Sequence, residues 1–162
     1  MIPASLARAL AGFALGFGVV TCSTSAALST LVGPEADLVQ RTNHLREERQ
    51  LIPLRGSADL GRVARAHAEE MARHGYLSHI NLAGQNPLER VQAAGVGGFR
   101  LLAENIAASS IPGDRTAVAI EGWLQSPTHR ENLLNPAFNT TGVAIVQTPD
   151  HRTIFVQLFA TF

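Results

Sequence analysis

The stretch TGVAIVQTPDHRTIFVQLFATF, residues 141–162, decides the fold class of this chain. Its two halves, 141–147 and 153–162, are rich in β-branched, aromatic and other apolar residues, as β-strands are. Thr148-Pro149-Asp150-His151, which lie between them, are typical of a tight turn. We therefore predict that the chain ends in a β-hairpin. A further strand is expected at 100–108.

Helices are predicted to precede and interrupt these strands. Helical spacing of apolar residues, or a helix start signal, occurs at 35–50, 57–74, 86–94 and 114–126, and a further turn is expected at 129–134. The expected N-terminal caps are Ser57 or Asp59, Asn86, Asp114 and Thr128. Because helices come first and the antiparallel strands come late, we predict an α+β protein with helices layered on a sheet.

The first 27 residues are expected to be a signal peptide. Ala9–Val20 is an apolar run of twelve residues. Such a run is too short to cross a ~30 Å hydrocarbon core as a helix, but it suits the hydrophobic part of a signal peptide. Ser25-Ala26-Ala27 then fits the small-residue rule for cleavage. We interpret residues 28–37 as a short linker and residues 38–162 as one domain.

Cys22 lies within this leader, after Val19-Val20-Thr21, and the four residues resemble a bacterial lipobox. The cysteine is therefore either lipidated at a new N-terminus or discarded with the peptide. Both outcomes predict a protein that is secreted or held at the cell envelope, with no transmembrane helix in the mature chain. Because Cys22 is the only cysteine, an intramolecular disulfide and a cysteine-ligated zinc finger are excluded.

The charge balance of the 162 residues excludes some classes of partner. Thirteen arginines, with no lysine, face thirteen acidic residues, so the formal net charge is zero. A neutral chain without arginine-rich blocks is not expected to bind nucleic acid through phosphate neutralisation. It is also not expected to bind a membrane surface through a polybasic segment. We expect a monomeric domain.

Candidate chemistry is concentrated in three polar segments. HExxH, GxSxG, P-loop, GxGxxG and EF-hand motifs are all absent. What remains is Ser78-His79, Glu104-Asn105 and residues 126–132, SPTHREN. Two histidines and a glutamate suit an open zinc site as well as acid–base catalysis. His79, Glu104 and His129 are 25 residues apart each time, so spacing alone does not show that they converge.

Other polar residues are expected to have structural roles. His67 lies on the apolar stripe of its helix, and we interpret it as a buried histidine bonded to a backbone carbonyl. Asn105 is expected to satisfy backbone groups at the sheet. Arg130 either clamps an anionic group or pairs with Glu131 or Glu104, and we favour the pair. The histidines expected to be solvated are His44, His74 and His151.

An ordered series of motifs resembles the CAP superfamily, also called SCP, which comprises cysteine-rich secretory proteins, antigen 5 and pathogenesis-related 1 proteins. The resemblance covers about residues 38–162 and, because disulfides are lacking, is to the bacterial branch. The matching pieces are Asn43-x-x-Arg46, Ala66-His67-Ala68-x-x-Met71-Ala72, Ser78-His79, Pro87-x-x-Arg90, Glu104-Asn105-x-Ala107, Trp123-x-x-Ser126-Pro127-x-His129-Arg130-x-Asn132 and Gly142-Val143-Ala144.

The resemblance implies an α–β–α sandwich with a small central antiparallel sheet, helices on both faces and an open cleft. In the family this cleft holds two histidines and two acids, which bind zinc or another divalent ion in some members. His79 matches the first histidine, Glu104 the first acid and His129 the second histidine. Gln125-Ser126 stands where the second acid belongs. We therefore expect no required cofactor, and only weak binding of a divalent cation by His79 and His129.

Two functions from different classes follow. The first is a secreted module that binds a lipid or sterol, a cell-wall component or a protein through a cleft containing His79, Glu104, His129, Ser126 and Arg130, and catalyses nothing. The alternative is a hydrolase, peptidase-like or metal-assisted, that uses the same cleft. Ser126 precedes His129 by three positions, but no nucleophile elbow or oxyanion-hole glycine motif accompanies it.

Overall fold

A computed structural model describes residues 33–162 of the chain. The expected signal peptide at 1–27, Cys22 within it and the first part of the expected linker lie outside these residues. Among residues 33–162, no helix combines the length and apolar character that crossing a bilayer requires.

A four-stranded sheet forms the middle layer, with the strand order β1-β3-β4-β2. The terminal hairpin is formed by β3 (Thr140–Gln147) and β4 (Thr153–Thr161), and β2 (Leu101–Ser109) pairs antiparallel with the other side of β4. All nine residues of β4 are buried, because this strand is flanked by neighbours and covered on both faces. The two-residue strand β1 (Arg55–Gly56), which we did not predict, pairs parallel with β3.

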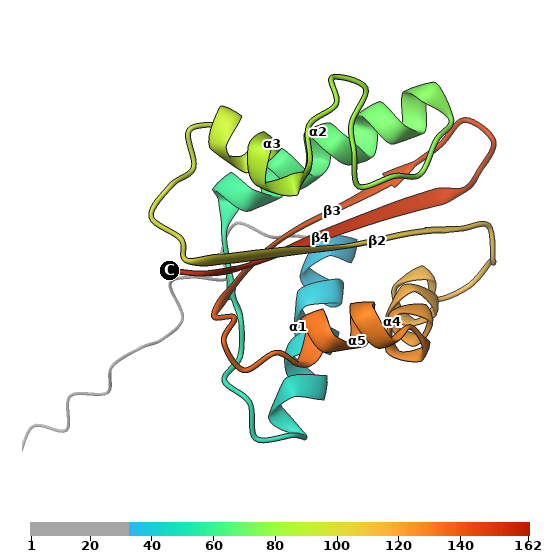
Figure 1. Cartoon of the computed structure of the whole chain (residues 1–162). Helices are drawn as coiled ribbons and strands as arrows, with labels where there is room; N and C mark the ends of the chain where they lie inside the picture. Colours follow the sequence, from blue (N-terminus) through green and yellow to red (C-terminus); the bar gives the residue numbers. More distant parts are fainter. Residues whose placement is uncertain (1–32) are drawn as a thin grey trace, which may run out of the picture.

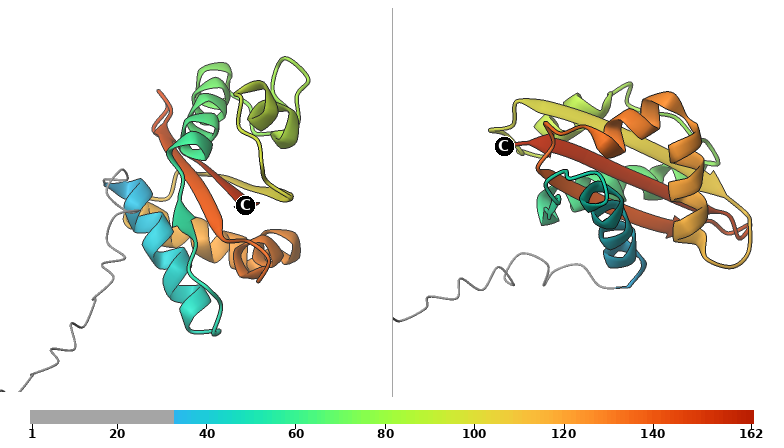
Figure 2. Two further views of the ribbon diagram at one scale, coloured as in Figure 1. Left: turned by 90° about the vertical axis from the view of Figure 1, so that its left-hand side faces the viewer. Right: turned by 90° about the horizontal axis from the view of Figure 1, so that it is seen from below.

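Helices cover both faces of this sheet (Figures 1 and 2). On one face lie α2 (Ala58–His74) and α3 (Pro87–Ala93). On the other lie α1 (Pro34–Glu47), α4 (Arg115–Gln125) and α5 (Pro127–Leu134). The α+β class and the α–β–α sandwich are thus confirmed.

Most helix starts follow local capping chemistry. The side chains of Ser57, Asn86 and Asp114 accept hydrogen bonds from backbone N–H groups in the first turns of α2, α3 and α4. The prediction of Thr128 as a cap was wrong. Ser126 is the N-cap of α5, and Pro127 occupies the first helical position, where its missing N–H costs nothing.

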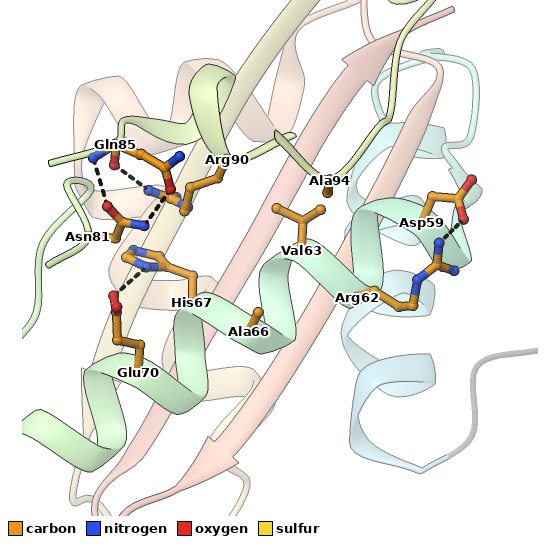
Figure 3. A pocket seen from close by; sticks show the side chains of 10 residues that line it. All are labelled: Asp59, Arg62, Val63, Ala66, His67, Glu70, Asn81, Gln85, Arg90 and Ala94. Carbon is orange, nitrogen blue, oxygen red and sulfur yellow. Dashed lines mark hydrogen bonds and ion pairs between the residues drawn. The ribbon is translucent and has the colours of Figure 1, made fainter. Parts of the chain in front are cut away.

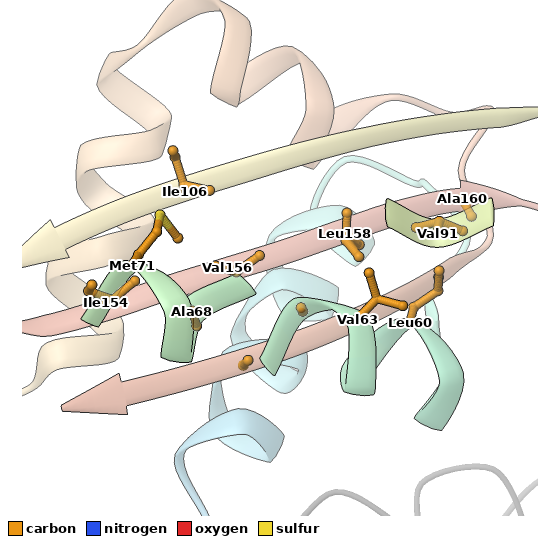
Figure 4. Packing of buried hydrophobic residues seen from close by; sticks show 12 residues of the cluster. Leu60, Val63, Ala68, Met71, Val91, Ile106, Ile154, Val156, Leu158 and Ala160 are labelled. Carbon is orange, nitrogen blue, oxygen red and sulfur yellow. The ribbon is translucent and has the colours of Figure 1, made fainter. Parts of the chain in front are cut away.

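Two apolar clusters separate the layers. On the α2 side, Val63 and Met71 pack against β4 residues (Figure 4). Here α2 passes so close to β3 that a Cβ at Gly142 would lie 2.3 Å from the Leu60 carbonyl carbon, so only glycine fits. On the other side Trp123 is 1% exposed and its Nε1 donates to the Ile106 carbonyl at 3.0 Å. Trp123 is therefore part of the core on this side of the sheet.

Arg46 ties α1 to the chain that follows α5. Its side chain is fully buried, and no carboxylate pairs with it among residues 33–162. Instead, the guanidinium donates to four carbonyls, those of Ile52, Leu133, Asn135 and Phe138, at 2.9–3.0 Å. Burial lowers the pKa of Arg46 from its ordinary value. These bonds hold α5, and with it His129, in place beneath the sheet.

Candidate functional site

The structure brings His79, Glu104 and His129 together at the edge strand of the sheet. Glu104 lies on β2, His79 on the loop between α2 and α3, and His129 on α5. The rings of His79 and His129 have centroids 6.5 Å apart and are tilted by 46°. The helical layers on the two faces of the sheet therefore each supply one imidazole, and β2 supplies the carboxylate. We call these three residues the histidine cluster.

The strand alternation of β2 explains this arrangement. Successive side chains point to opposite faces of a sheet. Glu104 contacts Arg90 of α3 on one face, whereas Asn105 donates to the His129 carbonyl of α5 at 2.9 Å on the other. Asn132 in turn donates to Asn105 at 2.9 Å. As predicted, Asn105 satisfies a backbone group, but that group lies on α5 and not at the sheet, and the bond holds the start of α5 against β2.

Glu104 is the buried centre of the histidine cluster. Its side chain is only 1% exposed, and both carboxylate oxygens are bonded. Oε1 accepts from His79 Nδ1 at 2.8 Å, and Oε2 accepts from Arg90 Nη2. An anion buried to this degree is tolerated only when it is paired and hydrogen-bonded. Arg90, itself 6% exposed, supplies that pairing.

Arg90 also holds the loop that carries His79. Its Nη1 donates to the His79 carbonyl at 2.6 Å and to the Gln85 carbonyl at 3.2 Å. His79 is therefore fixed twice, through its backbone by Arg90 and through its ring by Glu104. Since Nδ1 donates its proton to Glu104, Nε2 of a neutral His79 carries a lone pair, and 46% of the side chain is exposed.

His129 is the second imidazole of the histidine cluster. Burial, followed by the nearby charge of His79, lowers the pKa of His129 below the ordinary histidine value. The ring is half-buried. The arrangement thus presents two imidazoles to solvent, one of them oriented by a buried carboxylate.

The donor set fits at most a weak two-imidazole cation site. Among residues 33–162, no group of three or more His, Cys, Asp or Glu side chains is placed to hold a metal ion. Glu104 is close, but its oxygens are committed to His79 and Arg90. Because the side chain is also buried, Glu104 can orient His79 as a ligand but is not itself presented to a cation. Gln125 and Ser126, at the end of α4 and the cap of α5, supply no second acid.

The remaining candidates take different positions. Arg130 is exposed and pairs with no acid in the described part of the chain, so the expected pair with Glu131 or Glu104 was wrong. The arginine that pairs with Glu104 is Arg90, which lies on the face of the sheet opposite to Arg130. Between residues 33 and 162, no hydrogen bond or ion pair joins Ser126 to either imidazole of the histidine cluster.

His67 is structural, as predicted. It is 2% exposed, and its Nε2 bonds the Ser78 carbonyl at 2.8 Å, which steadies the loop beside His79. The sequence interpretation gave no role to Arg90. The available signal was its place in the Pro87-x-x-Arg90 motif, on a short helix whose N-terminus is closed by a capping box of Asn86 and Glu89.

With this geometry established, comparisons with known proteins identify the family. Residues 39–159 match the model of the Cysteine-rich secretory protein family, CAP. The chain therefore belongs to the CAP family. It is also 30% identical over 128 residues to the uncharacterized protein YkwD of Bacillus subtilis, covering 78% of this chain and 48% of that protein. It is 32% identical over 115 residues to an uncharacterized protein of Borreliella burgdorferi, covering 71% and 70%. The chain thus spans about half the length of YkwD.

Solved structures agree with this assignment. An outer surface protein from Borrelia burgdorferi superimposes with a TM-score of 0.71 at 27% identity, covering 79% of this chain and 92% of that one. An extracellular protein containing an SCP domain from Bacillus anthracis gives 0.70 at 32% identity, covering 80% and 41%. The CAP fold of the chain therefore has bacterial counterparts of known structure.

Proposed function

We propose that this protein is an exported CAP domain that acts by binding a ligand at the histidine cluster and catalyses no reaction. The observation that carries this proposal is that both carboxylate oxygens of Glu104 are already hydrogen-bonded inside the protein. A general base must lie within reach of the proton it removes, whereas the Glu104 side chain is only 1% exposed and its oxygens already accept from His79 and Arg90. The carboxylate therefore positions an exposed imidazole for contact.

The same contacts count against the hydrolase alternative. A serine nucleophile requires a hydrogen-bonded base and donors for the developing oxyanion. The Nδ1 of His79 is hydrogen-bonded to Glu104, and in the described part of the chain no hydrogen bond links Ser126 to His129. Glu104 completes no triad with Ser126. Binding needs none of these additional groups.

The surroundings of His79 favour a ligand with an apolar part. Leu77, Ile80 and Leu82, on the same loop, are 48%, 47% and 61% exposed. Exposed apolar side chains beside polar groups are typical of binding sites. We propose a lipid, a sterol or an apolar protein segment, with a polar group that reaches the imidazoles. A purely polar cell-wall polymer would leave these side chains without a partner.

A divalent cation is an optional component of this proposal. His79 Nε2 and the His129 ring would hold it, with Glu104 orienting His79 from behind. A cation supplies two further coordination positions there, which a ligand carboxylate or hydroxyl can take. With two protein ligands only, binding should be weak.

Export completes the proposal. Residues 1–27 have the features of a signal peptide, and the relatives of known structure include an outer surface protein and an extracellular protein. Intact mass of the exported chain tests this point. A mature N-terminus at Cys22 or near Leu28 is expected, and a diacylglyceryl mass on Cys22 identifies a lipid anchor. Retention of Met1 through Arg8 would contradict export.

Calorimetric titration with Zn²⁺ tests the role of the histidine cluster. Wild type should bind weakly, and His79→Ala and His129→Ala should each abolish the heat of binding. The matched control is His74→Ala, which removes an exposed imidazole from α2 and should leave the binding unchanged. Equal affinity in all four proteins would place the cation elsewhere. Peptide hydrolysis that vanishes in His79→Ala would replace the binding proposal with the hydrolase.

A further inference from the structure

A cavity of about 290 Å³ lies between α2 and α3, apart from the histidine cluster (Figure 3). Its ten lining residues include none of the three residues of that cluster. Small apolar side chains, those of Val63, Ala66 and Ala94, occupy its middle, and Glu70 stands at one end. The volume lies just below the usual range for small-molecule sites, so the cavity suits a small group.

Glu70 is held by the loop that follows α2, and one of its carboxylate oxygens is left over. Oε2 accepts from the Tyr76 hydroxyl and from the Leu82 backbone N–H, the latter at 3.3 Å. Oε1 accepts no hydrogen bond from any residue of 33–162, and 26% of the side chain is exposed. The bond from Tyr76, above all, lowers the pKa of Glu70 below its ordinary value. The cavity lining therefore contains an ionised carboxylate, fixed in place, with one available acceptor oxygen.

No cationic side chain in the described part of the chain neutralises Glu70. His67 Nδ1 lies 4.0 Å from Oε2, but burial lowers the pKa of His67 and disfavours its charged form. Arg73 and His74, the next basic residues of α2, are exposed and form no ion pair with Glu70 within residues 33–162. The negative charge of Glu70 is thus left to solvent or to a ligand.

The other charges of the cavity lining are already paired. Asp59 accepts from Arg62 at 2.6 Å, and Arg90 pairs with Glu104, which is not part of the lining. The cavity therefore has the net charge of one carboxylate, which disfavours an anionic ligand. Between residues 33 and 162 no group of three or more His, Cys, Asp or Glu side chains is placed to hold a metal ion. A guanidinium group pairs best with both oxygens of a carboxylate, whereas Glu70 offers only one.

We propose that the cavity between α2 and α3 binds an alkylammonium group, of a free amine or of a lysine side chain, that donates to Glu70 Oε1 and packs its hydrocarbon stem on Val63 and Ala66. An ammonium is a compact point charge and does not need the second carboxylate oxygen. The stem covers apolar side chains that a hydrated inorganic cation would leave in water. This site is additional to the histidine cluster and does not depend on it.

Titration of the ¹⁵N-labelled protein with cadaverine and with Nα-acetyl-lysine amide, followed by ¹H–¹⁵N NMR, tests the proposal. Both compounds should cause saturable shifts of the amides of Ala66, Glu70 and Ala94. Nα-acetyl-norleucine amide keeps the hydrocarbon stem but lacks the ammonium group, and it should cause no saturable shift. Added NaCl should weaken the binding, because the interaction is between two charges near the surface.

Two variants separate the charge from the space. Glu70→Gln keeps the shape and should weaken binding at least about tenfold, as expected for the loss of one charge-assisted bond. The matched control is Glu69→Gln, which makes the same change at an exposed neighbouring residue outside the cavity lining and should leave the affinity unchanged. Ala66→Trp keeps the carboxylate but fills the cavity from an exposed helix position, and it should abolish the shifts.

Three results would overturn the proposal. The first is the absence of saturable shifts with both amines. The second is equal binding of the norleucine compound, which would make the cavity a hydrocarbon site. The third is unchanged affinity in both Glu70→Gln and Ala66→Trp. Tighter binding of cadaverine would support a free amine as the ligand, and tighter binding of the lysine compound would support a peptide side chain. Zn²⁺ binding by the histidine cluster should be the same in Glu70→Gln as in wild type, so a failure at either site is recognised separately.

Discussion

Replacing Glu104 by glutamine should destabilise the fold strongly, because it leaves a buried charge without its partner. Arg90 is 6% exposed, and its Nη2 has Glu104 as its only carboxylate within the described residues. Glutamine keeps one acceptor oxygen, but its NH₂ group must then face either Arg90 or His79, both of which are donors. Breaking one side of a buried ion pair typically costs about 3–5 kcal/mol. We expect Glu104→Gln to lose that much of its free energy of unfolding.

Equilibrium urea unfolding, followed by the fluorescence of the single buried Trp123, measures this loss. Glu121→Gln is the matched control, since it makes the same chemical change on an exposed position of α4 and should stay within about 0.5 kcal/mol of wild type. His79→Ala should cost less than about 1 kcal/mol, because it leaves the pair of Glu104 and Arg90 intact and removes a half-exposed ring.

A double-mutant cycle isolates the pair itself. Arg90→Gln combined with Glu104→Gln removes both charges, so its cost should be well below the sum of the two single changes. A loss below about 1 kcal/mol in Glu104→Gln, or simple additivity in the double variant, would refute the reasoning that this carboxylate is a buried, doubly bonded centre.

Three further predictions address the fold. Trp123→Ala should cost about 3–5 kcal/mol in urea unfolding followed by circular dichroism, whereas a loss below about 1 kcal/mol would show that Trp123 contributes little to the core. Arg46→Lys should abolish cooperative thermal unfolding, because one ammonium cannot reach the four carbonyls that Arg46 satisfies. Each buried carbonyl left without a hydrogen bond costs about 1–3 kcal/mol. A wild-type melting curve would disprove this prediction. The pKa values of His67 and His129 are lowered in the folded protein, so the unfolded chain takes up protons first as the pH falls below ~6.5. The free energy of unfolding should therefore decrease below that pH. The decrease should be smaller in His67→Gln, and an equal decrease would contradict the lowered pKa of His67.

Local chemistry made most secondary structure predictable from the sequence. The caps at Ser57, Asn86 and Asp114 are contacts within one turn of the chain, and a pattern of neighbours is enough to find them. The turn 148–151 likewise lies between strands that pair directly. Thr128 was misassigned because Pro127 already begins the helix. The strand β1 was missed because two residues paired to a distant partner carry no periodic signal.

The site was less accessible to local reasoning. His79, Glu104 and His129 are far apart in sequence, and only the resemblance to the CAP family suggested their convergence. Arg90 was missed as the partner of Glu104, and Arg130 was favoured instead, because nothing in the sequence states which face of β2 each side chain takes. The role of Arg46 was missed for a different reason, because its four acceptors are backbone carbonyls, which have no sequence signature.

The most direct test of the histidine cluster as one binding site is a histidine-selective long-range ¹H–¹⁵N NMR titration with Zn²⁺. His79 should start as the tautomer with its proton on Nδ1, where Glu104 accepts it. The ring nitrogens of His79 and His129 should then shift together, with one binding curve, while those of His44, His74 and His151 remain unchanged. Separate curves for His79 and His129, or shifts confined to His44, His74 and His151, would contradict the account.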